Sequence, residues 1–359
     1  MSQDNQSNAP EASLSSPPKL DAPAILYAVR WMIHDTFRQA LTTNLFWVML
    51  VLSGIFIVFC LGTKVTTGLL DPDPKAAELT SISQEGKPIP VTDRLDRKLG
   101  EISLLFGAVT IPETRYAEEA VIFIRWVMSS FVAGVLGFLL LLIWTSGFVP
   151  DFLQPSSASV LLTKPIPRWV IIFGKYLGVL TFVAFQLTVF FLGTWFALGI
   201  RNGVWDMGYL LGIPLVLLHF GTVYSFAVLI GVVTRSSIAS IFSSLAFWLA
   251  CWGMNYGRHH VVRIVNESAA KSEPSPFGAV TRMLTELGYW AFPKPVDIRI
   301  VTERVLAAGS KQIPTISADL GIDTFNQYQF MPEFSILASV FVAIGFLALA
   351  AHQLATTDY

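Results

Sequence analysis

Six long runs of residues without a single Asp, Glu, Lys or Arg constrain this chain more than any other feature of its sequence. They cover residues 39–63, 126–150, 176–200, 207–234, 236–257 and 334–357. An α-helix needs about 20 apolar residues to cross the roughly 30 Å hydrocarbon core of a bilayer, and each run reaches that length. A transmembrane β-barrel would show alternating segments of about 10 residues, and these runs do not alternate. We therefore predict six transmembrane helices, at about residues 43–63, 126–149, 170–200, 207–234, 236–257 and 334–355.

The composition agrees with this prediction. Charged residues make up 14% of the chain and hydrophobic residues 53%, whereas soluble domains carry about 25% charged residues. The formal net charge is −1, so no basic field exists to hold nucleic acid. We expect an all-α polytopic membrane protein that is surrounded by lipid and has no nucleic-acid partner.

Two different segments precede the first run. Residues 1–22 are rich in Ser, Pro and Asn and nearly devoid of large apolar side chains, so we expect a disordered tail. In residues 23–42, Arg30, His34 and Arg38 line one stripe of a helix and apolar residues line another. A helix with this asymmetry lies in the membrane interface, although a simple extension of the first span is the alternative.

The two long connections, residues 64–125 and 258–333, are predicted to lie outside the cytoplasm. Residues 102–111 alternate too weakly to assign a strand or a helix. An amphipathic helix is predicted around residues 279–289, followed at residues 292–295 by a Phe-Pro-Lys-Pro segment that must be extended or turning.

Short connections set the orientation, because Lys and Arg are enriched on the cytoplasmic side. With a cytoplasmic N-terminus, the inside receives six basic residues and the short outer connection receives Arg201 alone; the six are Arg30, Arg38, Lys164, Arg168, Lys175 and Arg235. We therefore expect a multi-pass protein of the plasma (inner) membrane with both termini in the cytoplasm.

The common motifs of catalysis and cofactor binding are missing from the sequence. It contains no G-x-x-x-x-G-K-[ST], H-E-x-x-H or G-x-S-x-G. We accordingly predict no catalytic, cofactor-binding or metal-binding residues and no ATPase site in this chain. Cys60 and Cys251 lie in apolar runs and are interpreted as small packing residues. The pair His259-His260 is interpreted as part of an interfacial polar rim, with a metal site as the weaker alternative.

Four polar side chains inside the runs are candidates for an intramembrane site: Gln186, His219, Tyr224 and Asn255. His219 is the one ionisable residue near mid-membrane; it could gate or bind a substrate, but a neutral histidine satisfied by a neighbouring helix is the default interpretation. Ion-coupled transporters use charged residues at membrane depth, and the runs contain none. Any energy for transport is therefore expected to enter from outside the chain.

The connection between the second and third runs has the most specific sequence. Residues 155–157, Pro-Ser-Ser, can cap a short helix, and Val160, Leu161 and Leu162 give that helix an apolar edge. Pro165 and Pro167 end it. Gly174 and Gly178, four residues apart, allow close helix approach, and Lys175 is expected to extend toward the headgroups. A short cytoplasmic helix of this kind suits docking into a groove of a partner.

Residues 161–168, Leu-Leu-Thr-Lys-Pro-Ile-Pro-Arg, followed by Phe-Gly-Lys-Tyr-Leu-Gly at 173–178, resemble the hallmark of type-2 ABC transporter permeases. The branch most similar is often described as involved in multi-copper enzyme maturation. The resemblance implies a coupling helix at residues 151–164, an elbow helix at 23–42, a separate ABC ATPase subunit, and a homodimer or paired permease acting as an exporter. It implies ATPase coupling by Asp151, Gln154, Ala158, Leu161, Leu162, Lys164, Pro165 and Arg168.

Two other classes of function remain open at this point. One is a non-transporting membrane scaffold whose long outer connections bind a partner protein, since such connections are longer than a simple link needs. The other is a membrane enzyme with an unfamiliar motif, which is weakened by the lack of any convergent acid–base set in the sequence.

Overall fold

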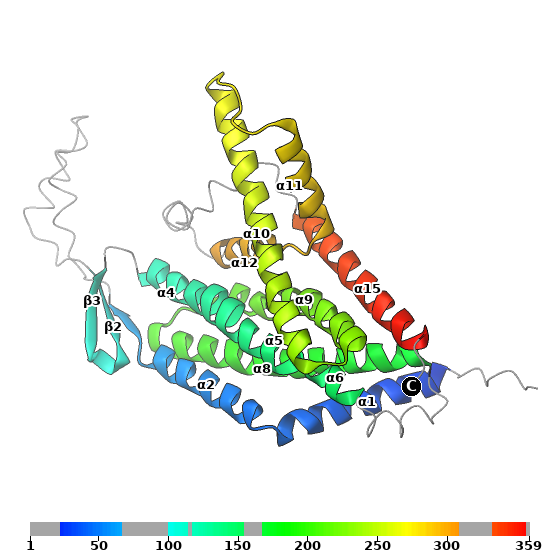
Figure 1. Ribbon diagram of the computed structural model, residues 1–359. Helices are drawn as coiled ribbons and strands as arrows, with labels where there is room; N and C mark the ends of the chain where they lie inside the picture. Colours follow the sequence, from blue (N-terminus) through cyan, green and yellow to red (C-terminus); the bar gives the residue numbers. More distant parts are fainter. Residues whose placement is uncertain (1–21, 67–99, 114–116, 154–166, 309–331, 357–359) are drawn as a thin grey trace, which may run out of the picture.

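The computed structural model describes residues 22–66, 100–113, 117–153, 167–308 and 332–356. Within these ranges six helices are long and apolar enough to cross a membrane, which confirms the predicted number (Figure 1). Four of them are single helices: α2 (Asn44–Leu61), α8 (Arg168–Asn202), α10 (Ser237–Ala270) and α15 (Pro332–Thr356). The fourth span joins a 3₁₀ turn, η5 (Met207–Leu211), to α9 (Gly212–Thr234).

The second span is composite and begins earlier than predicted. It runs through α4 (Ala117–Trp126), the π-helix η4 (Val127–Gly137), α5 (Phe138–Thr145) and α6 (Phe148–Phe152). The helix therefore begins before residue 126, the predicted start of the span, and already includes Arg125. This arginine is buried; its Nη2 donates to the Val204 carbonyl and its Nη1 lies 3.8 Å from Asp206 Oδ2. These partners, distant in sequence, let a charged residue continue the helix.

The fifth span continues well past its predicted end at residue 257. Ser236 caps the start of α10 by accepting a hydrogen bond from the Ala239 amide at 3.3 Å, and the helix ends only at Ala270. The predicted connection starting at residue 258 is thus partly helical. The predicted amphipathic helix is confirmed as α11 (Ala279–Ala291), and Phe292 after it has extended backbone angles.

One helix of this connection was missing from the prediction. α12 (Pro295–Ala308) begins with a proline, which suits the first turn of a helix. It packs against α4, α9, α10 and α15, and Figure 1 shows it between α10 and the second span. The connection therefore folds back onto the bundle.

The described part of the first long connection forms a three-stranded antiparallel sheet in the order β1 (Lys64–Thr66), β2 (Gly100–Leu104), β3 (Val109–Glu113). The turn η3 (Leu105–Gly107) between β2 and β3 has positive φ angles at all three residues. This sheet adds a small β element to a protein that is otherwise helical in its described residues.

The first described helix, α1 (Ala22–Thr42), packs along the start of α8. A Cβ atom on Gly174 would clash with Met32 Sδ, and one on Gly178 would lie 2.6 Å from Thr36 Oγ1. The predicted close approach at these two glycines is confirmed. The location of α1 in the membrane interface stays a prediction.

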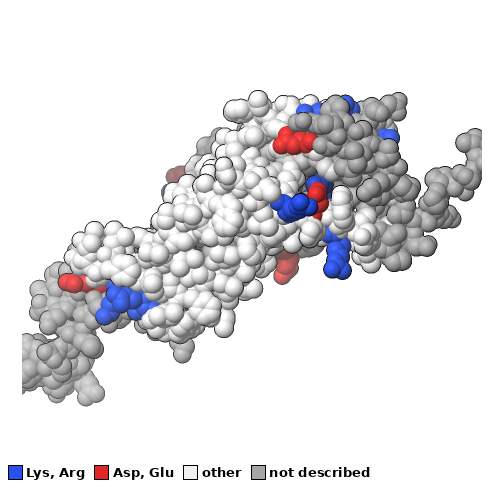
Figure 2. Space-filling view, turned by 90° about the horizontal axis from the view of Figure 1, so that it is seen from below, with Lys and Arg blue, Asp and Glu red and all other residues white. Residues whose placement is uncertain are grey.

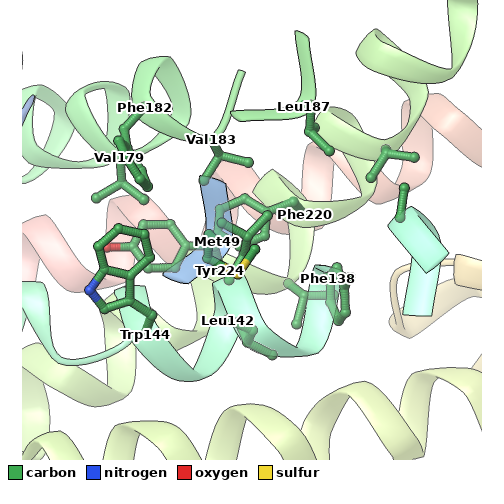
Figure 3. Close-up of a cluster of buried hydrophobic side chains, with 14 of the residues drawn as sticks. Met49, Phe138, Leu142, Trp144, Val179, Phe182, Val183, Leu187, Phe220 and Tyr224 are labelled. Atoms are coloured by element: carbon green, nitrogen blue, oxygen red, sulfur yellow. The ribbon is translucent and has the colours of Figure 1, made fainter. Parts of the chain in front are cut away.

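The centre of the bundle is apolar and formed by four spans. More than half of the residues of α9 are buried, and aromatic and aliphatic side chains of α2, α5 and α8 surround this helix (Figure 3). The labelled residues are Met49, Phe138, Leu142, Trp144, Val179, Phe182, Val183, Leu187, Phe220 and Tyr224. On the outside, Figure 2 shows a wide surface without charged side chains, with the coloured residues nearer the two ends, as a bilayer requires.

Replacing Gly178 by Ala should destabilise the protein. Thr36 is fully buried and its Oγ1 is held by the Met32 carbonyl at 2.8 Å, so it cannot yield to a new methyl group. We expect a loss of about 1–3 kcal/mol, measured as a lower unfolding temperature in detergent. Gly54→Ala in α2 is the matched control, because its Cβ would meet nothing within 4 Å. Equal effects of both substitutions would contradict this packing.

Candidate functional site

The predicted ATPase-coupling connection is described only at its two ends. Gln154, Ala158, Leu161, Leu162, Lys164 and Pro165 lie outside the described residues. Asp151 lies in α6, and Arg168 is the first residue of α8.

Both ends are held by helices other than their own. The exposed carboxylate of Asp151 accepts a hydrogen bond from Ser237 Oγ at 2.8 Å, which joins α6 to the start of α10. Arg168 Nη1 donates to the carbonyls of Leu354 at 2.7 Å and Ala355 at 3.2 Å. These carbonyls belong to the last turn of α15, where unpaired acceptors and the helix dipole favour a cation.

A third contact joins α8 to α1 further along α8. The Nζ of Lys175 lies 2.9 Å from Asp35 Oδ2 and 4.6 Å from the ring centre of Phe152. The expectation that Lys175 extends toward the headgroups is wrong, since its side chain is only 3% exposed in this salt bridge. An open polar recess of about 400 Å³ lies beside it, lined among others by Asp35, Arg38 and Asp151.

The four intramembrane candidates do not form one site. Gln186 Nε2 donates to Ser53 Oγ at 3.0 Å, and Tyr224 Oη is 3.4 Å from the Thr145 carbonyl. His219 stacks on Phe138 with 4.5 Å between ring centres, and its Nε2 accepts from Trp248 Nε1 at 3.3 Å. Each of these contacts joins two spans. Asn255 belongs to a different cluster.

That cluster surrounds the buried carboxylate of Asp297 on α12. Its Oδ1 accepts from Asn255 Nδ2 at 3.2 Å and from His259 Nε2 at 2.5 Å. Its Oδ2 accepts from Tyr289 Oη at 2.6 Å and from Ser335 Oγ at 2.5 Å. The backbone amide of Asp297 also donates to Asn255 Oδ1 at 3.1 Å. We call these five side chains the Asp297 network; they come from α10, α11, α12 and α15.

The network corrects one interpretation of the sequence. His259 does not line an interfacial rim but is buried against Asp297, while its neighbour His260 is exposed near Arg263. The residues of the network lie far apart along the chain and meet only in space. The four-residue spacing of Asn255 and His259 on one face of α10 was the available sign of it.

Asp297 is held as a carboxylate. Burial alone would raise its pKa, but the hydrogen bond and charge of His259, together with the hydroxyls of Ser335 and Tyr289, outweigh burial and lower the pKa. Burial and the Asp297 charge raise the pKa of Tyr289, which keeps its hydroxyl a donor. With four donors on two oxygens, the carboxylate has no capacity left for a ligand. The network therefore fixes α12 in place.

Lys294, just before this helix, is buried without a hydrogen-bond partner for its Nζ among the described residues. Its Nζ lies 4.6 Å from the ring centre of Tyr289 and 4.7 Å from that of Trp290, in cation–π contact. Burial lowers its pKa to about 8; nearby Asp297 opposes this shift and Arg258 adds to it.

Comparison of the sequence with models of protein families and with curated proteins finds no match. Among the residues that the structure describes, no group of three or more His, Cys, Asp or Glu side chains could hold a metal ion. The geometry of this chain and the motif at residues 161–178 are therefore the basis for a function.

Replacing Asp297 by Ala should destabilise the protein by on the order of 3 kcal/mol, because it leaves four buried donors without an acceptor. Asp297→Asn should cost less, since its amide can donate to the hydroxyls of Tyr289 and Ser335 while its oxygen still accepts. Thermal unfolding of both variants in detergent checks this order. A similar loss for both would show that charge, rather than hydrogen bonding, holds the network.

Lys294 should make stability depend on pH. Its pKa is near 8 in the folded protein and 10.5 in an unperturbed lysine, so between these values the unfolded chain keeps a proton that the folded protein has released. Stability then rises with pH across this window. We expect the unfolding temperature of the natural protein to rise from pH 8 to 10.5 relative to Lys294→Met; a constant difference would contradict the shifted pKa.

Proposed function

We propose that this chain is the membrane-spanning permease subunit of an ATP-driven ABC transporter, acting as an exporter. A separate ATPase would dock on the connection between the second and third spans, in the cytoplasm. The observation that supports this proposal most directly is the anchoring of both ends of that connection to α1, α10 and α15.

The anchoring suits the transmission of force. A push on residues 154–166 would reach α10 through Asp151 and Ser237, and α15 through Arg168 and Leu354. In Figure 1, α10 and α15 rise at a steep angle from the layer that contains α2 and α8. Because these two helices diverge from α2 and α8 toward their far ends, rocking them as a body is a natural opening motion.

The sequence supports the same proposal in two ways. The chain has no P-loop of its own, so hydrolysis would take place in a partner. The motif at residues 161–168 resembles that of type-2 ABC permeases, which would pair two such subunits around a substrate path. In this arrangement the protein resides in the inner membrane with both termini in the cytoplasm.

A non-transporting scaffold is the second candidate, and α11 is the observation that favours it. Val280, Met283, Leu284 and Leu287 are each more than half exposed on this helix. An apolar face outside the main bundle could hold a partner protein. Stimulation of ATP hydrolysis in a reconstituted complex separates the two proposals, since a scaffold would produce none.

Replacing Leu161 and Leu162 together by Asp should abolish docking of the ATPase, because two carboxylates cannot enter an apolar groove. The measurement is co-purification of a P-loop ATPase with the tagged chain from its native cells. Val109→Asp, at a half-exposed position of β3, is the control and should leave co-purification unchanged. Undiminished binding by the double variant would refute the docking assignment.

A further inference from the structure

A cavity of about 290 Å³ lies between the second span, α9, α10 and α12. Its apolar walls come from all four elements and include two tryptophans of α10; these residues are Val135, Val216, Trp248, Trp252, Pro295, Val296 and Ile298. Trp252 and Arg299 are exposed, so the cavity opens beside them. The residues that line it include no acidic side chain. A cavity of this size is near the lower end for small-molecule sites.

Three of the lining residues carry a buried polar atom that is not hydrogen-bonded to any described residue. The atoms are Ser129 Oγ, Ser130 Oγ and His219 Nδ1, and each side chain is more than nine-tenths buried. Leaving such a group unsatisfied destabilises the folded protein. Three such atoms lie at this one cavity. An occupant with matching polar atoms would hydrogen-bond to them and remove the unfavourable free energy of leaving them unsatisfied.

The two serines lack the partner that other hydroxyls of the same span find. Thr145 and Ser146, at the end of α5, donate to the carbonyls four residues earlier at 2.8 and 2.5 Å. Ser129 and Ser130 lie in the π-helix η4, whose wider turns change the position of these carbonyls. π-Helical segments are rare and are frequently found at functional sites.

The protonation of His219 follows from its neighbour. The indole nitrogen of Trp248 can only donate, and it donates to His219 Nε2. Nε2 therefore carries no proton, and the neutral ring has its hydrogen on Nδ1. The unsatisfied atom of His219 is a donor, and the serine hydroxyls can donate as well. All three groups can therefore donate a hydrogen bond to an acceptor on a ligand.

We propose that this cavity is a binding site for an uncharged, lipophilic small molecule that carries a carbonyl or ether oxygen. The apolar walls and the faces of Trp248 and Trp252 would hold its body, while up to two of the three donors, from Ser129, Ser130 and His219, would donate to its oxygen. The proposal goes beyond the proposed function and does not depend on it, since the site is formed within this single chain. It assigns a binding role to α12, which supplies one wall and is held there by the Asp297 network.

Benzophenone is a suitable probe, because it is uncharged and aromatic and its carbonyl is both the acceptor and the photoreactive group. The full chain, purified in nanodiscs without any ATPase, is labelled under light and its peptides are analysed by mass spectrometry. We expect saturable labelling of peptides from residues 127–137, 248–252 or 295–302. Fluorene, which has the same rings as fluorenone but no oxygen, should compete with the probe about tenfold less well than fluorenone, a loss of one to two hydrogen bonds.

Two variants test the site itself. Ser129→Ala with Ser130→Ala should weaken labelling about tenfold, yet leave the unfolding temperature without ligand equal or higher, because it removes unsatisfied groups. Ser146→Ala is the control and should label normally, since Ser146 does not line the cavity. Val216→Phe should abolish saturable labelling by filling the space.

Other results would overturn the proposal. Labelling that does not saturate and that spreads over lipid-facing helices in every variant would show that no such site exists. Equal competition by fluorene and fluorenone, or undiminished labelling of the double serine variant, would refute the oxygen acceptor. Because no ATPase is present, neither result bears on the permease assignment.

Discussion

The structure depends on one constraint: inside a bilayer, every polar group must find its partner within the protein. Most of the buried hydroxyls in the described spans meet it locally, by donating to a carbonyl one turn earlier, as Thr145, Thr194 and Ser244 do. Charged groups cannot meet it locally. Three charged side chains are buried because segments far apart in sequence provide a counter-charge or hydrogen-bond donors next to them; they are Arg125, Lys175 and Asp297.

The Asp297 network shows what this constraint does to the fold. One carboxylate gathers donors from α10, α11 and α15, so α12 cannot leave the bundle without exposing four donors to an apolar surrounding. Its side chains then become a wall of the neighbouring cavity. In this way α12, which lies within a predicted loop, becomes part of the helical bundle.

Two helices connect the proposed coupling end with this network. α10 contacts Asp151 through Ser237 at its start and Asp297 through Asn255 and His259 further along. α15 contacts Asp297 through Ser335 near its start and Arg168 through Leu354 near its end. A displacement of the connection between the second and third spans would therefore be transmitted to α12, and this geometry suits the proposed permease.

The sequence by itself determined the number of spans, the helix at residues 279–289 and the close contact at Gly174 and Gly178, because length, periodicity and small side chains act locally. It did not reveal α12, the sheet, the continuation of α10 or the burial of Lys175 and His259. These last two depend on Asp35 and Asp297, which lie more than thirty residues away from them. Whether a charged residue ends a membrane helix or stays buried in it is decided by a counter-charge, and only the tertiary structure brings that counter-charge near.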